Sequence, residues 1–203
     1  MKNIVITIER EYGSGGKYIG KKVADILGIE FYDEELLHKT YQNNDCIYSK
    51  LEEYDEVKRS SMFNFNLFGT DLYEEPYEYE TYQNFISDTI RSLADTTSCV
   101  IIGRNANNIL RGRDNIINIF VYSKDLDFKV NRKMKIEDLS YEDALIKLKQ
   151  VDKRRKKYYE FVNKDKVWAD KNDFDFFIDS NFLGVDKTAE LIAEIYKKFS
   201  KKK

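Results

Sequence analysis

Three glycines and a lysine near the start of the chain have the types and the spacing of a phosphate-binding loop. Gly13, Gly15 and Gly16 are followed at once by Lys17. Glycines let the backbone turn its N–H groups toward an anion, and the N-terminus of a following helix adds partial positive charge. A lysine at this point reaches the outer phosphates of a nucleotide. The expected chemistry is therefore the binding of a phosphate ester.

The segment departs from the pattern G-x-x-x-x-G-K-[ST] at two positions. Gly16 and Lys17 fit its core, but Glu11 replaces the first glycine and Tyr18 replaces the Ser or Thr that binds Mg²⁺. A tyrosine cannot coordinate the ion as a short hydroxyl would, so Ser14 or water would have to substitute. The alternative interpretation is a glycine-rich turn between a strand and a helix that binds no ligand.

The elements around the glycines are those that a phosphate-binding loop needs. An apolar β-type run at residues 3–8 precedes them, and residues 18–27 carry apolar side chains at helical spacing. Further strands are predicted at 29–32, 99–102, 115–122 and 174–178, and helices at 83–95, 141–162 and 185–199. Strands that alternate with helices predict βαβ units, and hence an α/β fold with a buried parallel sheet of about five strands.

Composition narrows the classes of protein to consider. The 203 residues suit one core, and 34 Lys+Arg nearly balance 36 Asp+Glu, so the net charge of −2 does not favour a nucleic-acid partner. The two cysteines, Cys46 and Cys99, fit a reducing compartment and argue against disulfides or a Cys-ligated metal. We see neither a signal peptide nor a membrane-spanning run, and no zinc-ligand spacing. We therefore expect a cytoplasmic protein without a membrane partner; the oligomeric state is not indicated.

Four segments resemble the cytidylate kinase-like family of P-loop nucleoside monophosphate kinases. They are residues 6–37, 100–110, 152–159 and 174–192. The arginine-glutamate-aromatic lead-in and the doubled glycine are similar to the cytidylate kinase-like branch, whereas true cytidylate kinases carry the complete loop motif. The resemblance implies a single domain over residues 1–203 with the three-layer sandwich of P-loop NTPases. It also implies an inserted acceptor-binding lobe at 38–82 and an arginine-bearing lid at 130–160.

The resemblance implies that the protein binds ATP with Mg²⁺ and transfers a phosphoryl group to a nucleoside monophosphate such as CMP or dCMP. The ATP phosphates would lie on the loop formed by Gly13, Ser14, Gly15, Gly16, Lys17 and Tyr18. Ser180, after the last strand, would lie near the base. Arg104 would grip the acceptor phosphate, although Asn105 follows it where cytidylate kinases have G-R-D.

A second group of arginines resembles the lid of these kinases. Asp152 and Arg155 form a D-x-x-R motif, which implies that Asp152 and Arg154 contact the acceptor. Lys17, Arg132 and Arg155 would be catalytic, because phosphoryl transfer depends on charge neutralisation and positioning. The alternative is that the run KRRKK is an ordinary solvated helix face.

Two other functions stay open. A kinase-like protein that binds nucleotide without turnover would suit the missing loop hydroxyl and the missing acid after Arg104. An interaction module would use residues 52–82, which are acidic and aromatic, to dock a partner, because phenylalanines in a loop must be buried against something. Within the enzyme class, the acceptor could be a different small metabolite.

Overall fold

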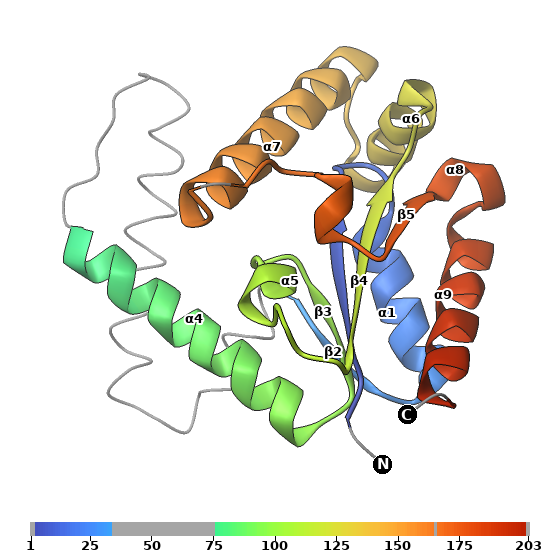
Figure 1. Ribbon diagram of the computed structural model, residues 1–203. Coiled ribbons are helices and arrows are strands. Elements are labelled where there is room, and N and C mark those ends of the chain that lie inside the picture. The colour runs from blue at the N-terminus through green and yellow to red at the C-terminus, as the bar shows by residue number, and fades with distance from the viewer. Residues whose placement is uncertain (1–2, 34–75, 165, 202–203) are drawn as a thin grey trace. The chain divides into compact units, whose positions relative to one another are not determined.

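A computed structural model describes residues 3–33, 76–164 and 166–201 of the chain, with side chains described from residue 83 onward in the second range (Figure 1). The chain divides into two compact units, one of residues 1–33 and 90–203 and one of residues 34–89. Most of the predicted acceptor-binding lobe, at 38–82, lies outside the described residues and stays a prediction. Its described end, residues 76–82, is the start of a helix.

Five parallel strands form one sheet, as the sequence predicts. They are β1 (Val5–Arg10), β2 (Glu30–Tyr32), β3 (Cys99–Ile102), β4 (Ile116–Tyr122) and β5 (Phe176–Asp179), in the order β2-β3-β1-β4-β5. Strand β1 is central, and its Val5 lies opposite Cys99 on one side and Ile116 on the other. Because the strands are parallel, the segments that follow them emerge at the same edge of the sheet.

Helices follow the strands in alternation. They are α1 (Gly16–Leu27), α4 (Pro76–Thr96), α5 (Ala106–Ile109), α6 (Leu126–Glu137), α7 (Tyr141–Val162), α8 (Ser180–Leu183) and α9 (Val185–Ser200), with a 3₁₀ turn at Lys171–Asp173. Helix α4 begins seven residues before its predicted start. Helix α6 was not predicted at all, because its sequence LDFKVNRKMKIE lacks an apolar stripe and buries only Lys129 and Val130.

The core lies between the sheet and the helices α1 and α9, which run side by side (Figure 1). Ile4, just before strand β1, and Ile6 and Ile8 within it are all buried. Ile19 of α1 and Ile192 of α9 pack against them and are fully buried as well. Removing this apolar area from water holds α1, and therefore the loop before it, in a fixed position on the sheet.

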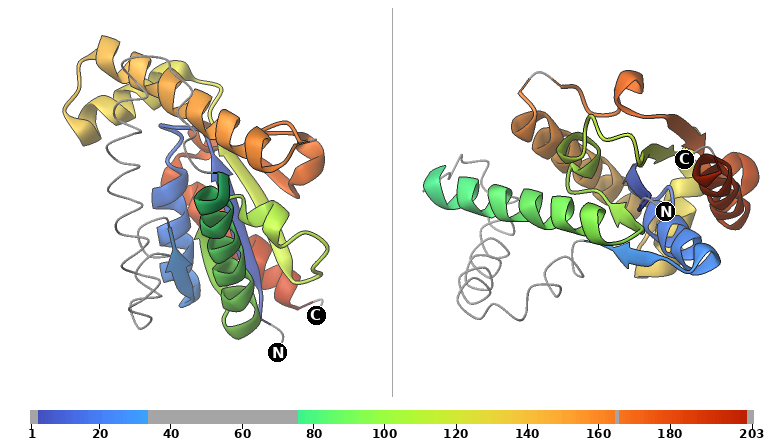
Figure 2. Two further views of the ribbon diagram at one scale, coloured as in Figure 1. Left: turned by 90° about the vertical axis from the view of Figure 1, so that its left-hand side faces the viewer. Right: turned by 60° about the horizontal axis from the view of Figure 1, so that its bottom comes forward.

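Helices α6 and α7 pack against each other at the end of the sheet where the strands finish (Figure 2). Val130 of α6 and Ala144 and Leu148 of α7 form their shared apolar cluster. Side chains capping both helices explain where they start: Asp125 accepts from the Phe128 N–H, and Ser140 from the Asp143 N–H. This helix pair, α6–α7, contains the residues of the predicted lid region at 130–160, and its action as a lid stays a prediction.

Candidate functional site

The loop between β1 and α1 has the backbone shape expected of a phosphate-binding loop. Gly13 and Gly15 adopt left-handed conformations, with φ of 83° and 88°. Each is also closely packed: a Cβ atom at Gly13 would lie 2.8 Å from Cβ of Lys129, and one at Gly15 would lie 2.7 Å from Cγ1 of Val185. Both positions therefore require glycine for conformation and for space.

Two buried serines fasten the loop from within. The hydroxyl of Ser14 donates to the carbonyl oxygen of Glu11 at 2.8 Å. The carbonyl oxygen of Ser14 in turn lies 2.6 Å from Oγ of Ser180, the first residue of α8, which is also 3.1 Å from the carbonyl oxygen of Tyr122. The segment after β5 is thus attached directly to the loop, and the contact of Ser180 with a base stays a prediction.

Glu11, which replaces the first glycine of the motif, joins the loop to its surroundings. Its Oε2 accepts hydrogen bonds from Nζ of Lys129 on α6, at 2.8 Å, and from the backbone N–H of Ser123 after β4, at 3.2 Å. Lys129 is almost completely buried. A buried ammonium requires a partner of this kind, so the carboxylate at position 11 has a structural role that sequence reasoning missed.

Tyr12 inserts between the helices of the pair α6–α7. Its hydroxyl is 2.6 Å from both carboxylate oxygens of Glu137, and Nζ of Lys133 lies 3.9 Å from its ring centroid. Although burial opposes the charged form of Glu137, hydrogen bonds from Lys133, Lys147 and Tyr12 lower its pKa to about 2. The backbone N–H of Tyr12 donates to Oδ1 of Asp152 on α7, at 2.7 Å. The loop is thus tied to both helices.

Lys17 and Tyr18, at the start of α1, point to different partners. Nζ of Lys17 lies 2.6 Å from Oδ2 of Asp33, which follows β2 and is buried, while the Lys17 side chain is 67% exposed. The hydroxyl of Tyr18 instead lies 3.1 Å from Oδ1 of Asp186 on α9, which also pairs with Lys22. The ammonium of Lys17 is therefore at the surface beside the loop, where a phosphate could reach it.

The predicted catalytic arginines both lie at the loop. Nε of Arg132, on α6, would be 3.2 Å from a Cβ atom at Gly15. Nη1 of Arg155, on α7, donates to the carbonyl oxygen of Arg10 at 3.1 Å and lies 3.7 Å from Oδ1 of Asp152. Burial lowers the pKa of Arg132, and burial together with the charge of Arg10 lowers that of Arg155 to about 10. Neither arginine is on a freely solvated face.

The predicted acceptor-binding residues lie in two places, on α7 and after β3. Asp152 contacts the loop backbone rather than open solvent, and Arg154 is half-buried beside it on α7. Arg104 follows β3, as predicted, in a left-handed turn where its φ is 55° and that of Asn105 is 59°. Reciprocal side-chain hydrogen bonds of 3.0 and 2.7 Å between Asn105 and Asn163 hold this turn to the end of α7. Acceptor binding by Asp152, Arg154 and Arg104 stays a prediction.

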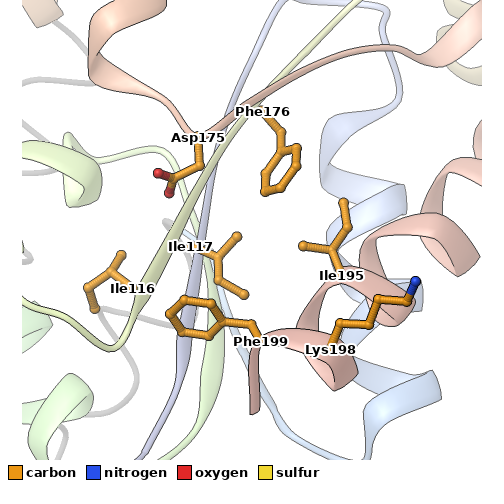
Figure 3. Close-up of a pocket in the computed structure, with 7 residues that line it drawn as sticks. All are labelled: Ile116, Ile117, Asp175, Phe176, Ile195, Lys198 and Phe199. Carbon is orange, nitrogen blue, oxygen red and sulfur yellow. The ribbon is translucent and has the colours of Figure 1, made fainter. Parts of the chain in front are cut away.

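A surface hollow of about 360 Å³ lies at the opposite end of the sheet (Figure 3). Ile116 and Ile117 of β4, Asp175 and Phe176 before and in β5, and Ile195, Lys198 and Phe199 of α9 line it. Ile116 pairs with Val5 at the beginning of β1, whereas the phosphate-binding loop follows the end of β1. The hollow is therefore separate from the loop and is not a candidate nucleotide site.

The oxygen ligands at the loop do not fit a Mg²⁺ ion held there by the protein. The hydroxyl of Tyr18 is engaged by Asp186, and that of Ser14 is buried and donates within the loop. Mg²⁺ prefers oxygen ligands in octahedral geometry. Over residues 3–33, 76–164 and 166–201, no three His, Cys, Asp or Glu side chains are grouped so as to hold a metal ion. None of the helices in those ranges is long and apolar enough to cross a membrane.

The parallel sheet, with a glycine-lysine loop between its central strand and α1, defines a P-loop kinase-like protein. The family model described as the cytidylate kinase-like family matches residues 5–181, and the chain belongs to this family. Both the resemblance and the fold class expected from the sequence are thereby confirmed. Membership supports phosphoryl transfer as the general reaction, but it does not identify the acceptor.

Solved structures show the same fold. An uncharacterized protein from Eubacterium ventriosum is 27% identical with a TM-score of 0.73, over 96% of this chain and 99% of that one. Shikimate kinase from Bacteroides thetaiotaomicron is 11% identical with a TM-score of 0.55, over 96% and 98%. Shikimate kinase from Acinetobacter baumannii, in complex with shikimate, is 15% identical with a TM-score of 0.50, over 97% and 94%. No curated protein matches the chain.

Proposed function

We propose that this protein transfers a phosphoryl group from ATP to a small acceptor, and that the acceptor is a nucleoside monophosphate such as CMP or dCMP. The observation that carries the proposal is the convergence of Lys17, Arg132 and Arg155 on one glycine loop, from three different helices. Phosphoryl transfer needs positive charge around the transferred group and little covalent chemistry. Membership of the kinase-like family supports the same reaction class.

In this mechanism the loop binds the phosphates of ATP through backbone N–H groups of residues 13–17 and the start of α1. Lys17 moves from Asp33 to the outer phosphates, which its exposure allows. Arg132 and Arg155 neutralise the charge that spreads over the transferred group. Arg104, after β3, contacts the acceptor phosphate, as arginine can bind two of its oxygens at once. No step is assigned to a protein-held Mg²⁺; the ion accompanies ATP as its counterion.

A second candidate function is nucleotide binding without turnover. The observation that favours it is the position of the Tyr18 hydroxyl, which is directed to Asp186 and leaves the loop without the usual metal-binding hydroxyl. A protein of this kind would retain the loop and its charge but release no ADP. Both candidates bind nucleotide, but only the first releases ADP, so assays of binding and turnover distinguish them.

The test is a coupled assay of ADP release with ATP and Mg²⁺ against CMP, dCMP, UMP, AMP and GMP, with nucleotide binding measured in parallel. We expect turnover with a pyrimidine monophosphate, and a loss on the order of 10²-fold in Lys17→Ala, the typical effect of removing one charge-stabilising donor. Lys21→Ala is the matched control, because Lys21 lies on the same helix and pairs with Asp25 at the surface. Binding without turnover would select the second candidate, and absence of both would refute the proposal.

A further inference from the structure

Arg10, the last residue of β1, occupies space that two distant glycines leave open. A Cβ atom at Gly16 would lie 2.6 Å from Cβ of Arg10, and one at Gly103 would overlap with its Nη1. The stem of Arg10 therefore passes against the start of α1, and its guanidinium lies over the turn after β3. A residue at Gly16 would collide with any side chain at position 10, whereas a residue at Gly103 would displace the guanidinium of Arg10 from its present position.

The guanidinium of Arg10 lies in an ion pair that is too long to be a hydrogen bond. Its side chain is 19% exposed, and the nearest ion pair among the described residues is with Glu9, at 3.8 Å. Within the same part of the chain, no hydrogen bond from the guanidinium is observed. The 3.8 Å between Arg10 and Glu9 is too long for a hydrogen bond, so donors of the largely buried Arg10 guanidinium are unused. Unpaired donors on a buried cation cost free energy unless a ligand accepts hydrogen bonds from them.

Arg155 brings a second positive charge to the same place. Its side chain is 24% exposed, it donates to the carbonyl oxygen of Arg10, and it lies 3.7 Å from Asp152. That carboxylate already accepts from the N–H of Tyr12 at 2.7 Å. The two neighbouring guanidiniums repel each other, and the carboxylates of Glu9 and Asp152 pair with them only at 3.8 and 3.7 Å, so an anion would find unused donors there.

We propose that Arg10 binds the phosphate group of the acceptor substrate beside Arg104, with Arg155 between that phosphate and the transferred group, which makes Arg10 a substrate-binding residue. The inference rests on the proposed function and deepens it. Arg10 leans toward β3, on the side of the loop where Lys17 and Asp33 lie, whereas Ser180 holds the loop from the β4–β5 side. A site on the β3 side is separate from the segment after β5 and suits the acceptor. An acceptor without a phosphate would leave donors of Arg10 unused, so the substrate class is a phosphate monoester.

The test is calorimetric titration of inorganic phosphate into protein saturated with a non-hydrolysable ATP analogue, which fills the phosphate-binding loop. The wild type, Arg10→Met and Arg10→Lys are compared. We expect Arg10→Met to bind phosphate about tenfold more weakly or worse, because a charge-assisted bidentate contact is lost, and Arg10→Lys to be intermediate. Affinity for the analogue should change by less than about twofold, since Arg10 contacts the acceptor and not ATP. Lys149→Met, on the exposed face of α7, is the control for loss of one charge.

The outcomes separate this inference from the proposed function. If Arg10→Met binds phosphate as the wild type does, or if the analogue-saturated wild type binds no phosphate, the inference is refuted while nucleotide binding stands. If the wild type does not bind the analogue, the proposed function fails.

Discussion

Tyr12 offers a quantitative test of how firmly the phosphate-binding loop is attached to the helix pair α6–α7. The change is Tyr12→Phe, which removes the hydroxyl and keeps the ring. The hydroxyl lies 2.6 Å from the carboxylate of Glu137, so the substitution deletes one charge-assisted hydrogen bond. The ring stays in its apolar cluster with Val130 and Leu148. The experiment therefore isolates the polar part of the contact.

The magnitude follows from the surroundings of Glu137. A hydrogen bond to a charged group contributes about 1.5–3 kcal/mol. Glu137 is 23% exposed and keeps hydrogen bonds from Lys133 and an ion pair with Lys147, so water and these lysines recover part of the loss. We expect the free energy of unfolding to fall by about 1.5 kcal/mol. With a urea slope of about 2 kcal/mol/M, the midpoint of unfolding moves down by about 0.7 M.

Tyr141→Phe is the matched control. The hydroxyl of Tyr141 donates to Oδ1 of Asp127 at 2.8 Å, which is the same chemical contact, but Tyr141 is 42% exposed. Exposed charge pairs are worth about 0–1 kcal/mol, so this variant should unfold within about 0.3 M of the wild type. Urea unfolding followed by circular dichroism measures both. Equal midpoints for the two variants would refute the claim that the Tyr12 hydroxyl fastens the loop to the helices.

Two further changes test other contacts of the loop. Ser180→Ala removes a fully buried hydroxyl shared by two carbonyl oxygens, so urea unfolding should show a loss of about 1–2 kcal/mol, and an unchanged midpoint would contradict that role. Burial raises the pKa of Asp152 from 3.8 to about 6. The folded protein therefore binds a proton that the unfolded chain lacks between these values, and stability falls as the pH rises through this window. Asp152→Asn should remove that fall, on the order of 2 kcal/mol between about pH 4 and pH 6, and a persisting slope would show that another group causes it.

The sequence predicts most of the sheet and the long helices because their apolar patterns are strong. The bounds of β3 and α7 match the predicted ranges of 99–102 and 141–162, and the other strands differ by one or two residues at either end. Helix α6 escapes prediction because its burial depends on a lysine and a valine rather than on an apolar stripe. Asp125 caps its start, but an aspartate alone does not indicate a helix without an apolar pattern after it.

The candidate site was predicted less completely than the fold. Motif and resemblance indicate the loop glycines, Lys17 and the arginines of the helix pair as candidates. Glu11, Tyr12 and Arg10 were not assigned, because their roles depend on partners far along the chain, such as Lys129 and Glu137. A motif describes the residues that touch a ligand. It says little about the side chains that fix the loop to the rest of the molecule.

The packing of Arg10 links two distant glycines to different parts of one side chain. A side chain at Gly103 would occupy the volume of the Arg10 guanidinium, and one at Gly16 would crowd its stem. The constraint at Gly16 holds for any side chain at position 10, because the close atom there is Cβ, whereas the constraint at Gly103 is specific to a long side chain. A short residue at position 10 would therefore free the space beside Gly103 and leave that beside Gly16 filled.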